Sequence, residues 1–414
     1  MNEIRDLMIG IDFGREYTQL CYYDRKAEEA RSVSMKVGTN LYEAPTCLCR
    51  RTQGDYCVGL EAEYFVKEKK GEMIDGLYEL SGSNEKVQAA GEEKEPWEIL
   101  SYFLEGILKF LGILDVEKNT RCLSITMPEL NQERVENFQK ACKSLGFEEK
   151  KFILMDYRES FYYYVLSQKR ETWNRSVAWY DFEPDKVHFL KLTISGTARP
   201  ALVKLESPAE TPLSETAEER DFEFSKFIHK TLEKELFSSI QITGRGFDPQ
   251  WASQSVKILC YQKRKVFYGN NLFAKGACLA AVERLEQHRL KGYRYFSESL
   301  VTKDVGMEMR IMGSPAYHPL IEAGKNWYEC KNQCEFILDD VKELVFVVGT
   351  MGETEKKRVA MGLPGLPSRP NKTTRIRLSL RYISPAQCEV TAEDMGFGEM
   401  YPSSGKVWKE LVQW

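Results

Sequence analysis

The chain has 414 residues, more than one hydrophobic core supports, so we expect two or three domains. Hydrophobic residues at 43% and charged residues at 29% are ordinary values for a globular protein. With 58 Lys and Arg against 62 Asp and Glu the net charge is only −4, and no basic stripe alternates with aromatic residues. The composition therefore argues against nucleic acid as a partner.

The first residues, MNEIRDLMIGIDFG, contain no basic segment followed by an apolar stretch, which a signal peptide would need. The most apolar helical stretch, residues 99–114, is interrupted by Glu105 and Lys109 and is short for a bilayer span. The 11 cysteines are an odd number without a disulfide framework, as is usual in a reducing compartment. We therefore expect a cytoplasmic protein that does not enter a membrane.

The first predicted elements form a hairpin. Residues 7–14 (LMIGIDFG) are an apolar strand that ends in Asp-Phe-Gly, and residues 17–23 (YTQLCYY) are the returning strand. A glycine at the turn would let a ligand approach the backbone. The same pattern is also typical of an ordinary hairpin turn.

Strands and helices then alternate. Residues 84–96 are charged and contain glycine, which predicts an exposed loop. Residues 121–128 are a buried-type strand, and Asn131 can cap a following helix that ends near Gly146. Residues 152–155 are a short strand that leads into the helix RESFYYYVLSQKR.

A second hairpin is predicted at residues 177–189 (VAWYDFEPDKVHF), with a strand that ends at Asp181 and a Glu-Pro-Asp turn. The polar segment 206–220 is expected to be a loop, followed by a helix at 221–237.

Residues 240–247 are predicted to be a strand that runs into a turn with Gly244 and Gly246. Helices are expected at 249–259 and 270–288.

Metal and nucleophile signatures are weak throughout. Cys47 with Cys49 and Cys330 with Cys334 are close pairs, but neither has a partner pair at zinc spacing, so buried or semi-buried thiols are expected. The histidines are far apart in sequence, at His188, His229, His288 and His318. The chain carries no zinc or haem signature, and no serine or cysteine nucleophile motif.

In this order the segments resemble the actin-like ATPase superfold and, within it, the seventy-kilodalton heat-shock chaperone family. The segments that carry the resemblance are IGIDFGREYTQL (first phosphate loop), VGLEA at 58–62, LSITMPELNQERVENFQKACKSLGF at 123–147, DYRESFYYYVL at 156–166, SVAWYDFEPDKVHFLKLTI (second phosphate loop), ITGRGF (adenosine loop) and AKGACLAA (last helix). Residues 359–406 resemble the second half of the chaperone's peptide-binding β-sandwich.

The resemblance implies an α/β, two-lobed, actin-like (ribonuclease H-like) body over residues 1–295 and an all-β sandwich over residues 300–414. Few residues separate Asp181 from Gln241, where the family inserts a helical subdomain over the adenine, so this insertion is expected to be shortened or absent. Residues 299–306 occupy the place of the interdomain linker but lack its leucine-rich run.

The resemblance also implies a site for ATP or ADP with Mg²⁺. The implied cofactor-binding residues are Asp12, Gly14, Arg15, Glu159, Asp181, Gly244 and Gly246. Asp12 and Asp181 would hold Mg²⁺ through water and serve as the catalytic carboxylates of an active enzyme, or they simply end their strands as turn formers. The family's catalytic lysine has no assigned counterpart, since Lys67, Lys69 and Lys70 lie near its region on what is more often a solvated helical face.

Both phosphate loops depart from the family pattern. Arg15 and Glu16 replace two hydroxyl residues; Arg15 could pair with a phosphate, whereas Glu16 could repel one. In the second loop, residues 182–186 replace glycines and a threonine, and Pro184 has no N–H to donate. Losing one preorganised donor costs about a hundredfold or more in rate. We therefore do not expect an efficient enzyme, and if the chain is active we expect an ATPase.

Three functions remain open. The first is a chaperone-like protein with a degenerate nucleotide cleft, acting as a non-catalytic or weakly ATP-binding scaffold for a protein or extended peptide. The second is an active ATP-dependent chaperone in which Arg15 and Lys186 replace the lost donors by charge. The third is an actin-like structural protein that self-assembles. The sequence gives no oligomeric state.

The tail bears on how a peptide partner would be held. Candidates for an apolar peptide pocket are Trp327, Tyr328, Phe336 and Met351, and the alternative is that these side chains fill the sandwich core. The chain ends at Trp414, so the chaperone's helical lid is not expected and any client would be held weakly.

Overall fold

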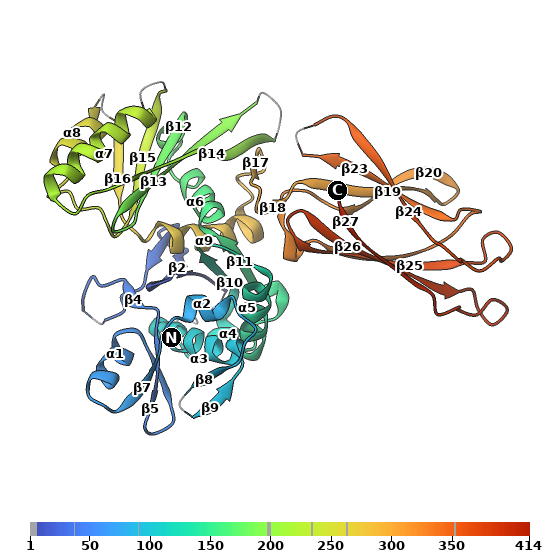
Figure 1. The fold of residues 1–414 in the computed structure, drawn as a ribbon, viewed down its shortest axis with the longest axis horizontal. Helices are drawn as coiled ribbons and strands as arrows, with labels where there is room; N and C mark the ends of the chain where they lie inside the picture. The colour runs from blue at the N-terminus through green and yellow to red at the C-terminus, as the bar shows by residue number, and fades with distance from the viewer. Residues whose placement is uncertain are drawn as a thin grey trace. The chain divides into compact units, whose positions relative to one another are not determined.

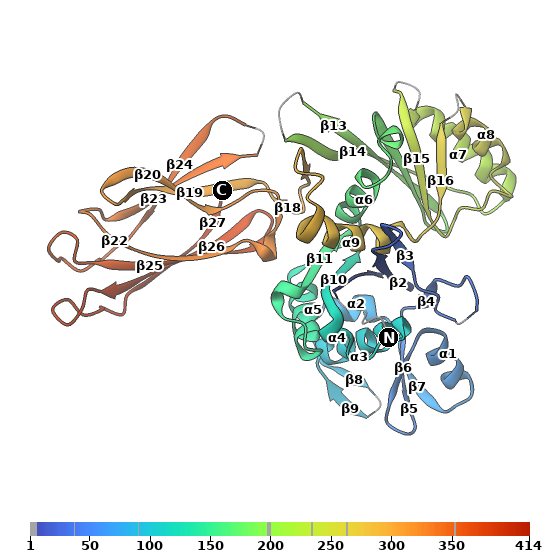
Figure 2. The ribbon, with the colours of Figure 1, turned by 180° about the vertical axis from the view of Figure 1, so that it is seen from behind.

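The computed structural model describes residues 6–36, 38–89, 91–196, 200–232, 235–261, 264–351 and 353–414. It divides into two compact units, of which the first ends at Arg294 and the second begins at Tyr295 (Figures 1 and 2). The first unit mixes helices with sheets, and the second is rich in strands. Every helix within these described ranges is too short or too polar to cross a membrane.

The first large sheet of the first unit has the strand order β11-β10-β1-β2-β3, and β4 pairs with β2 beside it. Its strands are β1 (Leu7–Phe13), β2 (Tyr17–Asp24), β3 (Glu29–Ser32), β4 (Glu43–Pro45), β10 (Thr120–Met127) and β11 (Phe152–Asp156). The central strand β1 is buried along its whole length, as expected for a continuous apolar run between parallel and antiparallel neighbours.

The second large sheet has the order β16-β15-β12-β13-β14-β17. Its strands are β12 (Ser176–Phe182), β13 (Lys186–Ser195), β14 (Ala201–Pro212), β15 (Phe237–Gly244), β16 (Lys265–Tyr268) and β17 (Tyr293–Phe296). The predicted hairpins at 7–23 and 177–189 are confirmed by the β1–β2 and β12–β13 pairs.

The two sheets repeat one topology. Each begins with an antiparallel hairpin, β1–β2 or β12–β13, which a third antiparallel strand extends on one side. On the other side, two strands that follow helical connections pair in parallel, β10 and β11 in one sheet and β15 and β16 in the other. The orders β3-β2-β1-β10-β11 and β14-β13-β12-β15-β16 are therefore equivalent.

Helices cover the sheets and separate them. The helices of the first unit are α1 (Gly59–Lys67), α2 (Leu77–Ser81), α3 (Pro96–Leu108), α4 (Val116–Asn119), α5 (Gln132–Ser144), α6 (Tyr157–Leu166), α7 (Ala217–Leu232), α8 (Ser253–Leu259) and α9 (Leu272–Val282). Phe13 on β1 packs its ring against Phe103 of α3 and Phe138 of α5, and α9 packs on the opposite face of the same sheet. Helices α7 and α8 cover the outer face of the second sheet, while α6 and α9 contact each other between the sheets (Figure 1).

Smaller sheets complete the first unit. They consist of β5 (Leu48–Arg51), β6 (Tyr56–Val58) and β7 (Gly71–Ile74), and of the hairpin β8 (Val87–Ala89) with β9 (Glu92–Lys94). The prediction that residues 84–96 are a plain loop is therefore wrong, because part of this charged segment pairs with itself.

The second unit contains two four-stranded antiparallel sheets with the orders β20-β19-β23-β24 and β22-β25-β26-β27, and the short pair β18-β21. Its strands are β18 (Leu300–Val301), β19 (Lys303–Ile311), β20 (Ser314–Ile321), β21 (Lys325–Asn326), β22 (Lys331–Ile337), β23 (Glu343–Thr350), β24 (Lys356–Gly362), β25 (Arg375–Ser384), β26 (Gln387–Gly396) and β27 (Val407–Gln413). Burial alternates residue by residue along β26, which is the pattern of a sheet with one covered face. Of the four candidates for a peptide pocket, Trp327 and Met351 are buried, as the core interpretation requires, whereas Tyr328 and Phe336 are only partly buried.

Two further segments differ from the prediction. Residues 206–212, expected in a loop, are the second half of β14. Residues 299–306, expected as a linker, contain β18 and the start of β19. Polar residues are tolerated in these strands because antiparallel sheets can leave one face in water. The helix predicted at 221–237 spans Ala217–Leu232 instead, and residues 233 and 234 lie outside the described residues.

Candidate functional site

The period of the strands points Asp12 and Asp181 toward the space between the sheets. Alternate residues of a strand face opposite sides, so Asp12 shares the face of Met8, which packs on α9. Asp181 likewise shares the face of Trp179, whose ring stacks on Phe161 of α6 at 4.7 Å. The two predicted metal-binding carboxylates therefore lie on the inner faces of the two sheets.

Asp12 is almost fully buried and accepts a hydrogen bond of 2.6 Å from the Tyr157 hydroxyl. Burial raises the pKa of Asp12 to about 8; the Tyr157 hydrogen bond lowers it, and the charges of Glu43 and Asp181 raise it further. Near neutral pH the carboxyl group is therefore largely protonated. A protonated carboxyl is a poor ligand for a hard cation such as Mg²⁺.

Asp181 lies at the end of β12 and accepts a hydrogen bond of 2.5 Å from the Thr243 hydroxyl on the neighbouring strand β15. The Trp179 indole N–H donates to the same hydroxyl at 2.8 Å. Burial raises the pKa of Asp181, and the bond from Thr243 opposes that shift. One oxygen of each candidate carboxylate, Oδ1, is thus engaged by a hydroxyl group of the chain itself.

Several backbone N–H groups beside these carboxylates are also engaged. In the first turn, the Gly14 N–H donates to the Tyr17 carbonyl at 3.1 Å. In the second, the Glu183 N–H donates to the Lys186 carbonyl at 2.9 Å. The N–H groups of Gly244 and Arg245 donate to the Asn270 side chain at 2.8 Å and to the Phe182 carbonyl at 3.2 Å.

Gly244 and Gly246 allow two turns of the chain to touch. Gly244 has a φ of +89°, and a Cβ there would lie 2.0 Å from the Phe182 carbonyl oxygen. A Cβ at Gly246 would lie 2.2 Å from the Glu183 carbonyl oxygen. The space that a glycine leaves for close backbone approach is therefore used by the Phe182–Glu183 segment.

A buried arginine on α7 holds the second turn in place through hydrogen bonds. Arg220 on α7 donates to the carbonyls of Pro184 at 2.7 Å, Gly246 at 3.0 Å and Ser214 at 3.3 Å. Burial lowers its pKa, yet an arginine remains charged at any physiological pH. The positive charge satisfies carbonyl groups of both turns and ties the Glu-Pro-Asp turn to the Gly244–Gly246 turn.

A side-chain network connects the two sheets. Glu43 on β4 forms an ion pair with Arg245, which follows β15, and accepts hydrogen bonds of 3.2 Å from Gln19 and Asn270. The Arg245 guanidinium also lies over the Tyr17 ring, 3.2 Å from its centroid. Arg245 therefore reaches from the second sheet to the first hairpin.

An aromatic stack lies beneath this network. The Tyr157 ring stacks on Phe273 of α9 at 3.9 Å with an interplanar angle of 6°, and Trp179 meets Phe273 edge-on at 5.6 Å. The Ser160 hydroxyl donates to the Phe273 carbonyl at 2.7 Å, which joins α6 to α9. The stack holds the Tyr157 hydroxyl against Asp12.

Two predicted site residues point elsewhere. Glu159 is buried and forms an ion pair with Arg284, just beyond α9. Arg15 is half exposed, donates to Glu79 at 3.3 Å and lies over the Tyr78 ring at 4.5 Å. The structure thus brings Asp12, Asp181 and the glycine turns into one region, while Glu159 and Arg15 have partners on neighbouring helices.

The remaining candidates are lysines and cysteines. Lys186 pairs with Glu183 at 3.4 Å, and Lys67, Lys69 and Lys70 are exposed. Cys47 and Cys49 are buried thiols. Over the described ranges, no group of three or more His, Cys, Asp or Glu side chains is arranged to hold a metal ion.

Two family models match the chain. Residues 29–298, more than half of the chain, match the model described as "Family of unknown function (DUF5716) C-terminal". The chain belongs to this family. Residues 300–414 match a second model, described as "Domain of unknown function (DUF8552)". No curated protein matches the chain. The family match includes Asp181, Gly244 and Gly246 and begins after the first hairpin, which carries Asp12.

Sequence reasoning missed the residues that organise the site. Tyr157, Glu43 and Arg220 act at distances of many residues along the chain, and no local motif marks them. A signal existed for Arg245, because a long cationic side chain between two glycines needs an anionic or aromatic neighbour. Its partners, however, come from strands β2 and β4 of the other sheet.

Proposed function

We propose that this chain is a chaperone-like protein-interaction scaffold, built on an actin-like body whose nucleotide cleft is degenerate and is non-catalytic or binds ATP only weakly. The repeated sheet topology supports the actin-like architecture, since that superfold is built from two such halves joined by crossing helices. Helices α6 and α9 contact each other between the sheets, as such an architecture requires. Fold alone does not carry chemistry, so the site decides the rest of the proposal.

The observation that carries the proposal is the engagement of the backbone donors. Phosphoryl transfer depends on N–H groups preorganised toward the phosphate oxygens. The N–H groups of Gly14, Glu183, Gly244 and Arg245 instead donate to acceptors within the chain. A nucleotide would have to break these bonds before it could gain their equivalents, which lowers its affinity.

The carboxylates support the same conclusion. Mg²⁺ takes ionised oxygen ligands, and one oxygen of Asp12 already accepts a hydrogen bond from the Tyr157 hydroxyl, which a metal-bound water would have to replace. Asp181 is occupied by Thr243. These residues fit the magnesium–nucleotide pair poorly, so we derive no hydrolytic step from them.

The second unit supports the interaction role. Strand β27 is at the edge of its sheet, and its Val407 and Leu411 are exposed. By contrast, the opposite sheet's edge strands carry Pro315 and Pro319 on β20 and consecutive cations on β24, which discourage pairing. This edge also carries the exposed Lys409 and Glu410, so an extended partner segment that adds a strand here would have to complement charged as well as apolar side chains.

The test is a calorimetric titration of the full chain with MgATP, together with thermal shift measurements. We expect neither heat nor a shift at about 1 mM nucleotide, which corresponds to binding weaker than about 4 kcal/mol. The matched control is the Asp12→Ala, Asp181→Ala double variant, which should behave like the wild-type protein in this titration. Micromolar binding that the double variant loses would overturn the proposal in favour of an ATP-driven chaperone.

Self-association is checked in the same preparations by sedimentation velocity. A scaffold of the proposed kind stays at a fixed, small size over a range of concentrations. Growth of filaments with concentration would instead favour the actin-like structural protein, since head-to-tail contacts that do not close produce filaments.

A further inference from the structure

A groove of about 630 Å³ lies at the end of the second sheet that is remote from Asp181. Strands β12 and β15 are parallel, and Asp181 and Gly244 are at their carboxyl ends. The groove is lined by Arg175, which precedes β12, and by Phe237, the first residue of β15. It is therefore separate from the candidate nucleotide cleft.

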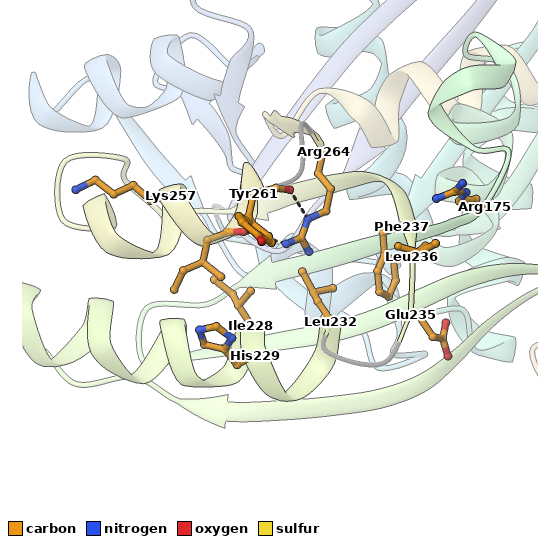
Figure 3. Close-up of a pocket in the computed structure, with 11 residues that line it drawn as sticks. Arg175, Ile228, His229, Leu232, Glu235, Leu236, Phe237, Lys257, Tyr261 and Arg264 are labelled. Atoms are coloured by element: carbon orange, nitrogen blue, oxygen red, sulfur yellow. Dashed lines mark hydrogen bonds between the residues drawn. The ribbon is translucent and has the colours of Figure 1, made fainter.

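The floor of this groove is apolar. Ile228 and Leu232 of α7 and Phe237 are buried members of the second sheet's hydrophobic core, and they border the hollow (Figure 3). At its margin, Leu236 and Tyr261 are 59% and 63% exposed. Apolar side chains thus continue from the core to the surface through the groove.

The rim is basic. Arg175 and Lys257 are exposed and lie at opposite ends of the groove (Figure 3). Arg264 lies between them, and its guanidinium donates to the carbonyls of Tyr261 at 3.0 Å and Ile258 at 3.1 Å, at the end of α8. Among the described residues, no acidic side chain forms an ion pair with Arg175, Lys257 or Arg264.

The acidic residue of the lining does not offset the rim. Glu235 forms an ion pair of 2.7 Å with Lys191, so its charge is already compensated. A second hollow of about 590 Å³ shares Arg175, Glu235 and Leu236 with the first and adds Arg170. The continuous surface, here called the basic groove, carries a local positive excess in a chain whose net charge is −4.

We propose that the basic groove is the docking site for an acidic amphipathic segment of a partner protein. This inference rests on the proposed scaffold function and names the chemistry of its partner. The apolar side of such a segment would cover the floor, and its carboxylates would face the rim cations. Charge complementarity of this kind sets specificity and the rate of association, while burial of the apolar anchors supplies most of the affinity.

The geometry favours a partner segment that binds through its side chains over a segment that adds a strand to a sheet. The floor comes from α7 and from the start of β15, so it presents side chains rather than a free row of backbone groups. An amphipathic helix meets such a groove with anchors at i, i+3, i+4 and i+7. We therefore expect the partner segment to place apolar residues at helical spacing, with Asp or Glu beside them.

The experiment is selection of a displayed random peptide library on the full chain, with removal of peptides that also bind an Arg175→Glu, Lys257→Glu, Leu236→Asp variant. We expect the retained peptides to be acidic, with apolar residues at helical spacing. A synthetic peptide of the consensus should bind the wild-type chain, and the triple variant should weaken it at least about tenfold.

Two controls make the outcome decisive. The Lys67→Glu, Lys140→Glu variant reverses two exposed cations elsewhere on the same unit and should bind the consensus peptide like the wild-type chain. Circular dichroism and the melting temperature verify that the triple variant is folded. Peptides that are basic, or a selection that retains nothing dependent on the groove, overturn the inference.

Other ligands of basic surfaces are separate outcomes. Titration with a single-stranded RNA and with vesicles containing anionic lipid should give no binding that the triple variant abolishes; such binding would also overturn the inference. Addition of MgATP should leave peptide affinity unchanged, because the groove lies at the opposite end of the sheet. Micromolar nucleotide binding would thus refute the proposed degenerate cleft without affecting the groove, and a failure of peptide binding would refute the groove without affecting the proposed cleft.

Discussion

The hairpins that open the two large sheets share their strand pairing but differ in how their turns are held. The first turn, after β1, is a short exposed turn in which Arg15 reaches outward to Glu79. The second, after β12, is fixed by the buried Arg220 and by the close approach of Gly244 and Gly246. One architecture thus carries a first turn with few contacts and a second turn that is exposed but held by contacts from α7 and from the Gly244–Gly246 turn.

This difference shows which of the two turns could offer N–H groups to a phosphate. A phosphate site needs turns whose N–H groups face the ligand, and the second turn is committed to its neighbours by contacts from α7 and β15. The first turn is less constrained, yet its Asp12 is held by Tyr157. The predictions below test the two turns against each other, starting with the largest effect.

Substituting Gly244 by alanine should destabilise the chain most, by about 4 kcal/mol or more. The φ of +89° is strained for alanine, and the new Cβ would meet the Phe182 carbonyl oxygen, a backbone atom that cannot rotate away. Urea unfolding measures the loss. Gly54→Ala is the matched control, because Gly54 has a φ of +96° with open space around it, and its cost should be about 1 kcal/mol. Equal effects of the two substitutions would contradict this account of the second turn.

Removing the Arg220 side chain should cost about 2–4 kcal/mol, because four carbonyls lose a charged donor. Arg15→Ala is the counterpart in the first turn. It removes an exposed pair with Glu79 and should cost less than about 1 kcal/mol. The comparison is made by urea unfolding followed through tryptophan fluorescence, since Arg220 lies over the Trp251 ring. A larger loss for Arg15→Ala would reverse our ranking of the turns.

The Asp12→Asn variant should gain stability relative to the wild-type chain as the pH rises. The pKa of Asp12 is about 8 in the folded chain and 3.8 as a model value, so the folded state holds the proton more tightly. Wild-type stability therefore falls as the pH rises between these values, and asparagine, which cannot ionise, removes that slope. We expect the variant to gain on the wild-type chain from pH 5 to pH 8 by up to about 1.4 kcal/mol per pH unit.

Urea midpoints at several pH values measure this difference. Asp181→Asn should change the slope in the same direction, because burial raises the pKa of Asp181 as well. A wild-type chain that gains on the Asp12→Asn variant toward alkaline pH would show that Asp12 is ionised and paired.

The smallest effect is expected for Arg245→Ala, about 0.5–1 kcal/mol, because Arg245 and Glu43 are both partly exposed. A double-mutant cycle with Glu43→Ala should show coupling of similar size. The cycle tests whether the two sheets are connected through this ion pair, and zero coupling would remove that connection.

Much of the body could be read from local pattern. The hairpins at 7–23 and 177–189, the capped helix after Asn131 and the apolar helix after Asn270 all appear where period and turn residues place them. The polar strand β14 was missed because its composition resembles a loop, and its pairing with β13 supplies the missing information. The positions of Asp12 and Asp181 at strand ends were likewise visible in the sequence.

The succession of strands, turns and helices therefore follows from the sequence alone, because hydrophobic period and glycine placement act over a few residues. The contacts of Asp12, of the second turn and of Glu43 depend instead on tertiary packing. Tyr157 reaches Asp12, Arg220 reaches the second turn and Arg245 reaches Glu43 across long chain separations. Burial, which sets the pKa of Asp12, and the assembly of the basic groove from α7, α8 and the start of β15 likewise exist only once distant segments pack together.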